Sequence, residues 1–246
     1  ADMAPTTDAL MAGKMMNAGQ ICLAPDYVFV PRDRMGEFVE SSKRSVAKMY
    51  PTLLDNPDYT SVINARHFQR INGYVDEARE RGVEVVEINP ADEDFRQQSA
   101  HKIAPTLLID PPEDSAVMQE EIFGPVMPIK SYESLDETLD YVNSHDRPLG
   151  LYYFGTDQEE TQRVLNQTTS GGVTLNDVVM HVAQEDLPFG GVGHSGMGAY
   201  HGEDGFRTFS HAKAVFKQAT FNPAEKLGLR PPYGDKLMGL LKTQIK

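Results

Sequence analysis

The sequence contains very little cysteine and no long apolar run, and its basic residues are outnumbered by acidic ones. Cys22 is the only cysteine among 246 residues, which excludes an internal disulfide and a thiolate metal cluster. One thiol without a disulfide partner is typical of a reducing compartment, so we expect a cytoplasmic protein. Lys+Arg 23 against Asp+Glu 36 gives a net charge of -13, which disfavours binding to the phosphate backbone of nucleic acids.

Segments for a membrane or a secretory route are also missing from the sequence. No stretch approaches the roughly 18 uninterrupted apolar residues that cross a bilayer. The N-terminal residues lack a charged region followed by an apolar one, as a signal peptide would have. We therefore expect no membrane contact. The chain starts at Ala1 in helix-like sequence without an initiator methionine, which we interpret as a fragment boundary.

Strand-like and helix-like segments alternate in the middle of the chain. The expected strands are residues 126–132, 151–154 and 172–175. The S-x-x-E spacing from Ser134 to Glu137 predicts a capped helix start, and Thr156 begins a similar pattern. A strand-helix-strand-helix-strand (βαβαβ) order requires parallel strands with right-handed crossovers. We therefore predict an α/β fold, with three αβα layers and a mostly parallel sheet.

The N-terminal third follows the same pattern. We expect a helix up to about Asn17, a strand at residues 27–30, and a helix from about Arg34 to Met49 with Asp33 as its N-cap. A further helix, with Phe68 on its apolar face, precedes a strand at residues 83–88. We expect residues 89–100 to form an exposed loop and the glycine-rich residues 190–205 to form an irregular loop. The residues after 217 are expected to form a tail on the surface.

Cys22 follows the run Asn17-Ala18-Gly19-Gln20-Ile21, in which Gly19 is expected to terminate the preceding helix. One interpretation is a packed structural cysteine, since free cysteines are often buried. A papain-like nucleophile is excluded because the C-G-S-C-W surroundings of that family are absent.

Two other segments favour a catalytic interpretation. They are Glu120-Glu121-Ile122-Phe123-Gly124-Pro125-Val126 and the stretch Leu187-Pro188-Phe189-Gly190-Gly191-Val192-Gly193-His194-Ser195-Gly196-Met197-Gly198. In this order, together with the segment ending at Cys22, they resemble the aldehyde dehydrogenase superfamily over residues 1 to about 217. Residues 173–177 and 197–202 look most like its class 3 branch, and the sequence as a whole is similar to the bacterial enzymes that oxidise coniferyl aldehyde.

The resemblance implies a role for several residues. Cys22 matches the nucleophile that forms a thiohemiacetal and then a thioester, and its own backbone N–H matches one of two oxyanion donors. Glu121 matches the carboxylate that binds the nicotinamide ribose, and Phe123 the ring beside the nicotinamide. Without the flanking motif, these two residues would be read as a helix-end acid and a core aromatic.

A substrate-side loop is implied for Pro188, Phe189, Gly190 and Gly191, although a glycine-rich turn packed under the sheet fits the same residues. Asn176 follows an expected strand, at an edge where α/β sites gather. The histidines show no H-x-x-x-H pair, so we expect no metal.

The resemblance also implies parts that the sequence does not contain. Family members carry a dinucleotide-binding domain, a general-base glutamate and an oxyanion-hole asparagine ahead of the position of Ala1, and no G-x-G-x-x-G follows a strand here. We therefore expect residues 1–211 to be the catalytic domain of an NAD- or NADP-dependent enzyme that is inactive without its cofactor-binding domain. Residues 212–246 are expected to form the oligomerisation element and surface tail of a homodimer. The strand that pairs with the other subunit is expected to span residues 211–217. The alternative is a non-catalytic binding or assembly module that retains the fold.

Overall fold

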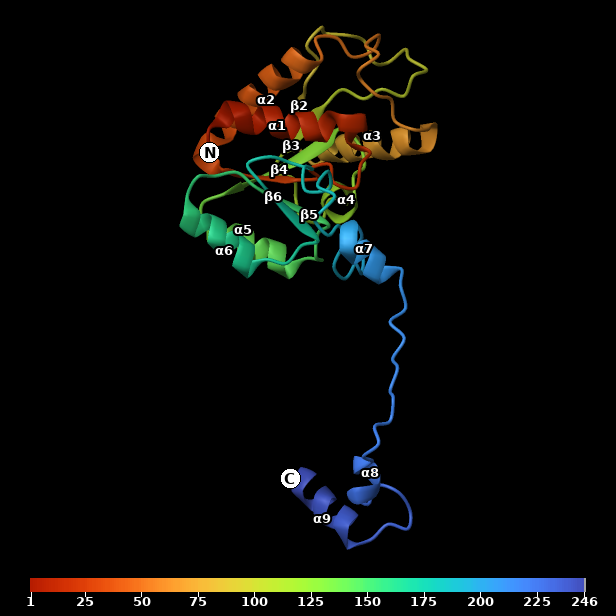
Figure 1. The fold of residues 1–246 in the computed structure, drawn as a ribbon. Coiled ribbons are helices and arrows are strands. Elements are labelled where there is room, and N and C mark those ends of the chain that lie inside the picture. The colour runs from red at the N-terminus through yellow and green to blue at the C-terminus, as the bar shows by residue number, and fades with distance from the viewer. Residues whose placement is uncertain (246) are drawn as a thin grey trace. The chain divides into compact units, whose positions relative to one another are not determined.

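The computed structural model describes residues 1–245, and its contacts divide the chain into two units, Ala1–Phe209 and Ser210–Lys246. Figure 1 shows the order of the elements along the chain. The helices of the first unit are α1 (Met3–Met15), α2 (Met35–Met49), α3 (Ala65–Glu80), α4 (Ala116–Gln119), α5 (Leu135–Ser144), α6 (Gln158–Gln167) and α7 (Gly202–Thr208). Its strands are β1 (Val28–Pro31), β2 (Glu84–Glu87), β3 (Thr106–Ile109), β4 (Val126–Tyr132), β5 (Gly150–Tyr153) and β6 (Gly172–Leu175).

The strands of the first unit form two sheets. A four-stranded sheet has the order β1-β4-β3-β2, in which β4 is parallel to both β1 and β3 while β2 is antiparallel to β3. Strands β5 and β6 pair in parallel in a separate two-stranded sheet. The expected α/β fold with a mostly parallel sheet is confirmed. One implication of the βαβαβ order was wrong, because β5 does not pair with β4 in the described chain. Both edges of β4 are already occupied by β1 and β3.

Helices cover both faces of the larger sheet because adjacent residues of β3 point to opposite sides. Leu107 belongs to a core cluster with residues of α1 and α2, and its neighbour Leu108 belongs to a second cluster with residues of α3. Both leucines are almost fully buried. Figure 1 shows α1 and α2 on the far side of this sheet from α5 and α6. The layers therefore follow from the alternation of apolar side chains along short strands.

Of the three helix N-caps that the sequence predicts, one agrees with the structure and two differ. The hydroxyl of Ser134 caps α5, as expected, by accepting the backbone N–H of Glu137. At α6 the N-cap is Asp157 rather than Thr156, and its carboxylate accepts the N–H groups of Glu159 and Glu160. Asp33 does not cap α2, because it lies inside a short 3₁₀ turn, Arg32–Arg34, that directly precedes the helix.

The second unit contains two helices where we expected only a tail, α8 (Pro223–Lys226) and α9 (Asp235–Gln244). Asn222 caps α8 with Pro223 at the first helical position, a pattern that favours a helix start. Residues 211–219 have no regular secondary structure and are exposed. They form no strand within this chain, so the pairing of residues 211–217 with another chain stays a prediction.

Candidate functional site

The thiol of Cys22 lies on a tight turn that follows α1. The helix ends at Met15, and the next turn, Met16–Gly19, has left-handed backbone at Asn17 (φ 51°), Ala18 (φ 51°) and Gly19 (φ 75°). The helix therefore ends two residues earlier than the expected Asn17. Cys22 follows this turn and is exposed. The thiol is therefore accessible, and the interpretation of Cys22 as a packed structural cysteine is excluded.

The side chain of Gln20 fixes this turn. Its Nε2 donates to the carbonyl oxygens of Asn17 at 2.9 Å and Ser61 at 3.0 Å, and its Oε1 accepts the N–H of Ile63 at 2.9 Å. The amide of Gln20 therefore joins the turn to the segment that precedes α3. The Gln of the sequence pattern has a positioning function that can be read from these contacts.

Gly19 brings the Cys22 turn against the segment of Glu121 to Gly124, the nicotinamide loop of our prediction. A Cβ at position 19 would lie 2.3 Å from the carbonyl oxygen of Gly124, so only glycine allows the two backbones to approach this closely. The positive φ of Gly19 makes the same demand. Two motifs separated by about a hundred residues thus approach each other closely through the backbone at Gly19 and Gly124.

Two charged side chains hold the loop from opposite sides. Asp26 accepts the N–H of Ile122 at 3.2 Å. Arg70, on α3, donates to the carbonyl oxygens of Glu121 at 3.2 Å and Ile122 at 2.7 Å. Ile122 is fully buried, so these bonds fix the peptide on either side of an anchored side chain. The sequence analysis did not identify Asp26 or Arg70, because nothing in the sequence around them predicts that they bind the Glu121–Ile122 backbone.

The side chains of Glu121 and Phe123 remain exposed on this loop. Phe123 is 38% exposed and adopts a left-handed backbone conformation (φ 49°), which is uncommon for a residue with a large side chain. Partial burial raises the pKa of Glu121, and the negative charge of Asp26 adds to the rise while Arg70 opposes it. The loop therefore presents a carboxylate and a ring to solvent from a rigid backbone. A core aromatic at position 123 is excluded.

A row of aromatic contacts leads from the thiol turn to the Pro188–Gly191 segment. The hydroxyl of Tyr152 donates to the carbonyl oxygen of Leu23 at 2.7 Å, directly after Cys22. Burial raises the pKa of Tyr152 to about 12, and the proximity of Cys22 adds to the rise. His181 packs 6.2 Å from the Tyr152 ring and 6.0 Å from the Phe189 ring. Sequence reasoning missed both Tyr152 and His181.

The Pro188–Gly191 segment is packed against the amino ends of β5 and β6. A Cβ at Gly171, just before β6, would lie 2.3 Å from the carbonyl oxygen of Gly190 and 3.1 Å from the Cα of Gly191. Phe189 is buried and forms a β-bridge with Tyr200, whereas Pro188 is exposed. The glycine-rich turn packed against a sheet is therefore present. It lies at the same end of the small sheet as Gly150, the first residue of β5, which is close to the side chain of Leu23.

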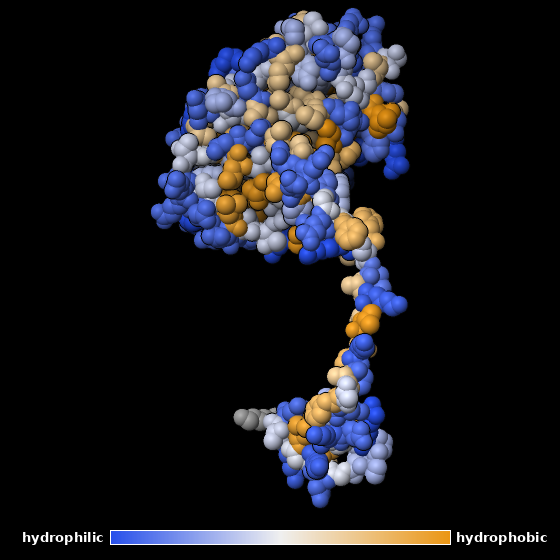
Figure 2. Space-filling view, in the orientation of Figure 1, coloured by the Kyte–Doolittle hydropathy of each residue, from blue (hydrophilic) through white to orange (hydrophobic). Residues whose placement is uncertain are grey.

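The structure separates Asn176 from these residues. Asn176 follows the carboxyl end of β6, and its side-chain oxygen accepts the N–H of Gly155 at 2.8 Å. This bond ties together the exits of β5 and β6, at the opposite end from Gly171. Figure 2 shows exposed hydrophobic side chains over this small sheet; Leu175 and Met180 are 43% and 47% exposed.

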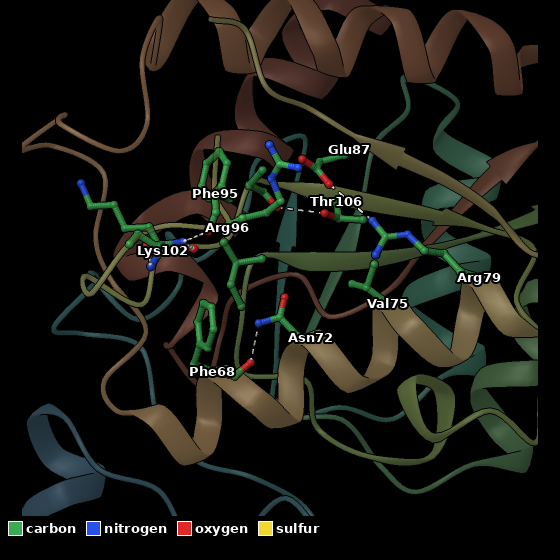
Figure 3. Close-up of a pocket in the computed structure, with 12 residues that line it drawn as sticks. Phe68, Asn72, Val75, Arg79, Glu87, Phe95, Arg96, Lys102 and Thr106 are labelled. Carbon is green, nitrogen blue, oxygen red and sulfur yellow. Dashed lines mark hydrogen bonds and ion pairs between the residues drawn. The ribbon is translucent and has the colours of Figure 1, made fainter. Parts of the chain in front are cut away.

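A cavity of about 260 Å³ lies elsewhere, between α3 and the segment that leads into β3. Figure 3 shows its lining, in which Phe68 and Phe95 face the space and Arg79 pairs with Glu87. Neither Cys22 nor Glu121 lines it. Among residues 1–245 there is no group of three or more His, Cys, Asp or Glu side chains placed to hold a metal ion, and no helix has the length and apolar character to cross a membrane.

Comparison with known sequences identifies the family to which this chain belongs. The model of the aldehyde dehydrogenase family matches residues 1–215, so the chain belongs to it.

Within the family, the chain is 60% identical over 246 residues to a probable coniferyl aldehyde dehydrogenase of Caulobacter vibrioides, covering all of this chain and 51% of that protein. It is 41% identical over 226 residues to the dimeric NADP-preferring aldehyde dehydrogenase of Rattus norvegicus, covering 92% of this chain and 48% of that one. The substrate-bound structure of Staphylococcus aureus AldH superposes with a TM-score of 0.81 at 36% identity, covering this whole chain and 52% of that one. The chain spans about half the length of the relatives it matches.

Proposed function

We propose that this chain is the thiol-bearing part of an enzyme that oxidises an aldehyde to a carboxylic acid with NAD or NADP. The observation that carries the proposal is the approach of Gly19 to Gly124, which joins an exposed, solitary thiol to a rigid loop presenting Glu121 and Phe123. Membership of the aldehyde dehydrogenase family supports this assignment of the two motifs.

The thiol supplies a covalent route. After its proton has passed to solvent, the thiolate sulfur of Cys22 attacks the aldehyde carbon, and the carbonyl oxygen becomes an oxyanion within reach of the Cys22 backbone N–H. Loss of hydride from that carbon leaves a thioester on Cys22, and water then releases the acid and regenerates the thiol. Sulfur suits both halves of this sequence because it is a strong nucleophile and a good leaving group.

The nicotinamide cofactor, when bound, accepts the hydride. The residues of this chain that fit it are Glu121 and Phe123, because the exposed carboxylate can accept ribose hydroxyls and the exposed ring can pack beside a planar heterocycle. Their backbone is held by Asp26 and Arg70, so the ligand does not have to order the backbone of the loop. A preformed loop of this kind reduces the entropic cost of binding.

An aromatic aldehyde of the coniferyl type is the proposed substrate. The name of the Caulobacter relative supports this choice. The Pro188–Gly191 segment is the proposed substrate-side loop, because the Tyr152 and His181 contacts connect it to the turn that bears Cys22.

The proposal is tested by placing the amino-terminal half of a full-length relative ahead of Ala1. We expect this enzyme to form reduced nicotinamide from an aromatic aldehyde, and Cys22→Ser to abolish turnover. Failure of the restored enzyme on every aldehyde, with cofactor bound, would favour a non-catalytic module that retains the fold.

The 246-residue chain by itself is the matched comparison, and we expect it neither to bind NAD or NADP with micromolar affinity nor to turn over. One charge-assisted hydrogen bond contributes about 1.5–3 kcal/mol, whereas micromolar binding needs about 8 kcal/mol. Isothermal titration with both cofactors measures this. Sustained turnover by the chain alone would contradict the assignment of the site to two halves.

A further inference from the structure

A buried amine lies in the region that supports the nicotinamide loop. Lys14, near the end of α1, is 0% exposed, and its Nζ has no hydrogen-bond partner. Burial lowers the pKa of Lys14 to about 8, and the negative charge of Asp26 opposes the change. An ammonium group is rarely buried without a hydrogen-bonded partner because its desolvation is costly. The proposed covalent chemistry does not involve Lys14 and so does not account for the burial of this amine.

Asp26 binds the loop, and its negative charge also acts on Lys14. Asp26 is half-buried, and the N–H of Ile122 is its hydrogen-bond donor from that loop. Burial raises the pKa of Asp26, while the charges of Lys14 and Arg70 and the bond from Ile122 lower it. A neighbouring cation favours the ionised carboxylate, and an ionised carboxylate is the stronger acceptor for a backbone N–H.

Arg70 binds the carbonyl oxygens of the same loop segment. Its guanidinium donates to Tyr74 at 2.5 Å in addition to the loop carbonyls, and the Tyr74 hydroxyl donates to Glu120 at 2.6 Å. The guanidinium is thus fixed by groups on both sides of it. Between Asp26 and Arg70, the N–H of Ile122 and the carbonyls on either side of it are all bound.

We infer that Lys14, Asp26 and Arg70 act together as positioning residues that hold the Glu121–Ile122 backbone at the place where Glu121 meets the cofactor. Lys14 supplies a positive charge that favours the ionised form of Asp26; Asp26 and Arg70 hold the backbone directly. Phe123 has a left-handed backbone conformation, which is strained for a residue of that size and persists only when surrounding contacts hold it. The bonds from Asp26 and Arg70 to the preceding residues supply such contacts. The inference rests on the proposed function only in assigning Glu121 to the cofactor.

The link between Lys14 and Asp26 is tested on the chain itself by a double-mutant cycle of thermal unfolding. Asp26→Asn keeps an oxygen acceptor for Ile122 but leaves the buried ammonium without a countercharge, so we expect a lower Tm. Adding Lys14→Met, which is similar in length and uncharged, should then raise the Tm by more than it does in the wild-type background. Additive effects of the two substitutions would overturn the pairing.

The hold on the backbone is tested by amide hydrogen exchange at Ile122. Asp26→Ala should accelerate exchange of this amide at least tenfold, while amides in β3 and β4 keep their rates. Arg70→Gln should also accelerate it, whereas Arg79→Gln, a matched exposed arginine on the same helix, should not. Unchanged Ile122 exchange in both Asp26→Ala and Arg70→Gln would refute the inference.

In the restored enzyme, Asp26→Asn and Arg70→Gln should raise the KM for the cofactor and slow hydride transfer at least tenfold, with single-turnover aldehyde capture at Cys22 retained. The exchange and unfolding results could agree with the inference while these kinetic changes are absent. In that case the proposed role of Glu121 in cofactor binding would be rejected, and the positioning of the loop backbone by Asp26 and Arg70 would be retained. Loss of aldehyde capture together with slowed hydride transfer would instead indicate general misfolding and count against a positioning role.

Discussion

Cys22 is exposed on a rigid turn, and this placement makes a direct chemical test possible. We expect iodoacetamide to give one adduct on the folded 246-residue chain and none on Cys22→Ser, as measured by intact mass. The reaction should proceed without denaturant because the sulfur is accessible. A thiol that reacts only after unfolding would contradict its assignment as a nucleophile.

Lys14 gives the chain a specific pH dependence. Its folded pKa of about 8 lies below the value of about 10.4 expected for an unfolded chain, so between these pH values the unfolded state holds a proton that the folded state lacks. The free energy of unfolding should therefore rise with pH across this window.

The matched variant for this pH dependence is Lys14→Met. From pH 7.5 to 9.5, the wild-type free energy of unfolding should increase by about 2 kcal/mol relative to that variant. Urea unfolding of both proteins at the two pH values measures the difference. Parallel pH dependence in the two proteins would show that the amine is not desolvated.

The sequence predicts individual residues only where a local motif marks them. Cys22, Glu121 and Phe123 were found because each lies in a short, distinctive segment, and their exposure agrees with the assigned roles. Asp26, Arg70 and Lys14 carry no such mark, since a charged residue on a helix or after a proline is ordinarily solvated. Their importance depends on contacts between segments far apart in the sequence, and those contacts require the fold.

At the scale of elements, the Cys22 turn and the nicotinamide loop depend on one close approach. Gly19→Ala should lower stability in two ways, because φ 75° strains an alanine and its Cβ would collide with the carbonyl of Gly124. Gly82→Ala is a matched control, since Gly82 has φ 74° but no atom within 4 Å of an added Cβ.

Gly82→Ala should therefore cost only the conformational strain, about 1–2 kcal/mol. Gly19→Ala should cost more in thermal or urea unfolding, and in the restored enzyme it should impair hydride transfer as well. Equal destabilisation by the two substitutions would mean that the approach of Gly19 to Gly124 is unimportant to the fold.

The types of the elements were more predictable than their neighbours. Residues 126–132 and 172–175 are strands as expected, because apolar residues and turn signals lie close to each other in the sequence. The absence of a β4–β5 pair was not predictable, because it depends on β1 and β3 taking both edges of β4. The helix in residues 235–244 was missed because the prolines before it obscured its short apolar pattern.

For the whole molecule, the exposed residues 211–217 remain the predicted site of dimer formation. Val215 and Phe216 are 81% and 86% exposed, and an extended segment with free backbone groups can add to the edge of a sheet in another chain.

Light scattering of the chain with and without residues 212–246 measures this directly. We expect the longer form to have twice the mass per particle expected for a monomer, and the shorter form to be monomeric. The same association state in both forms would remove these residues from the interface. Retention of a cooperative unfolding transition by the shorter form is the control for folding.

The contact of Gly19 with Gly124 also has a consequence for protein engineering. Neither Gly19 nor Gly124 has room for an added Cβ, so we expect a library that varies these two positions to yield mostly destabilised proteins. The loop from Leu187 to Met197 is different, because Leu187, Val192 and Met197 are exposed by 47%, 38% and 94%. In the proposed enzyme, these three exposed side chains near the proposed substrate-side loop are therefore the first positions to vary, because we expect variants there to fold and to leave the Cys22 turn and the Glu121–Gly124 loop unchanged.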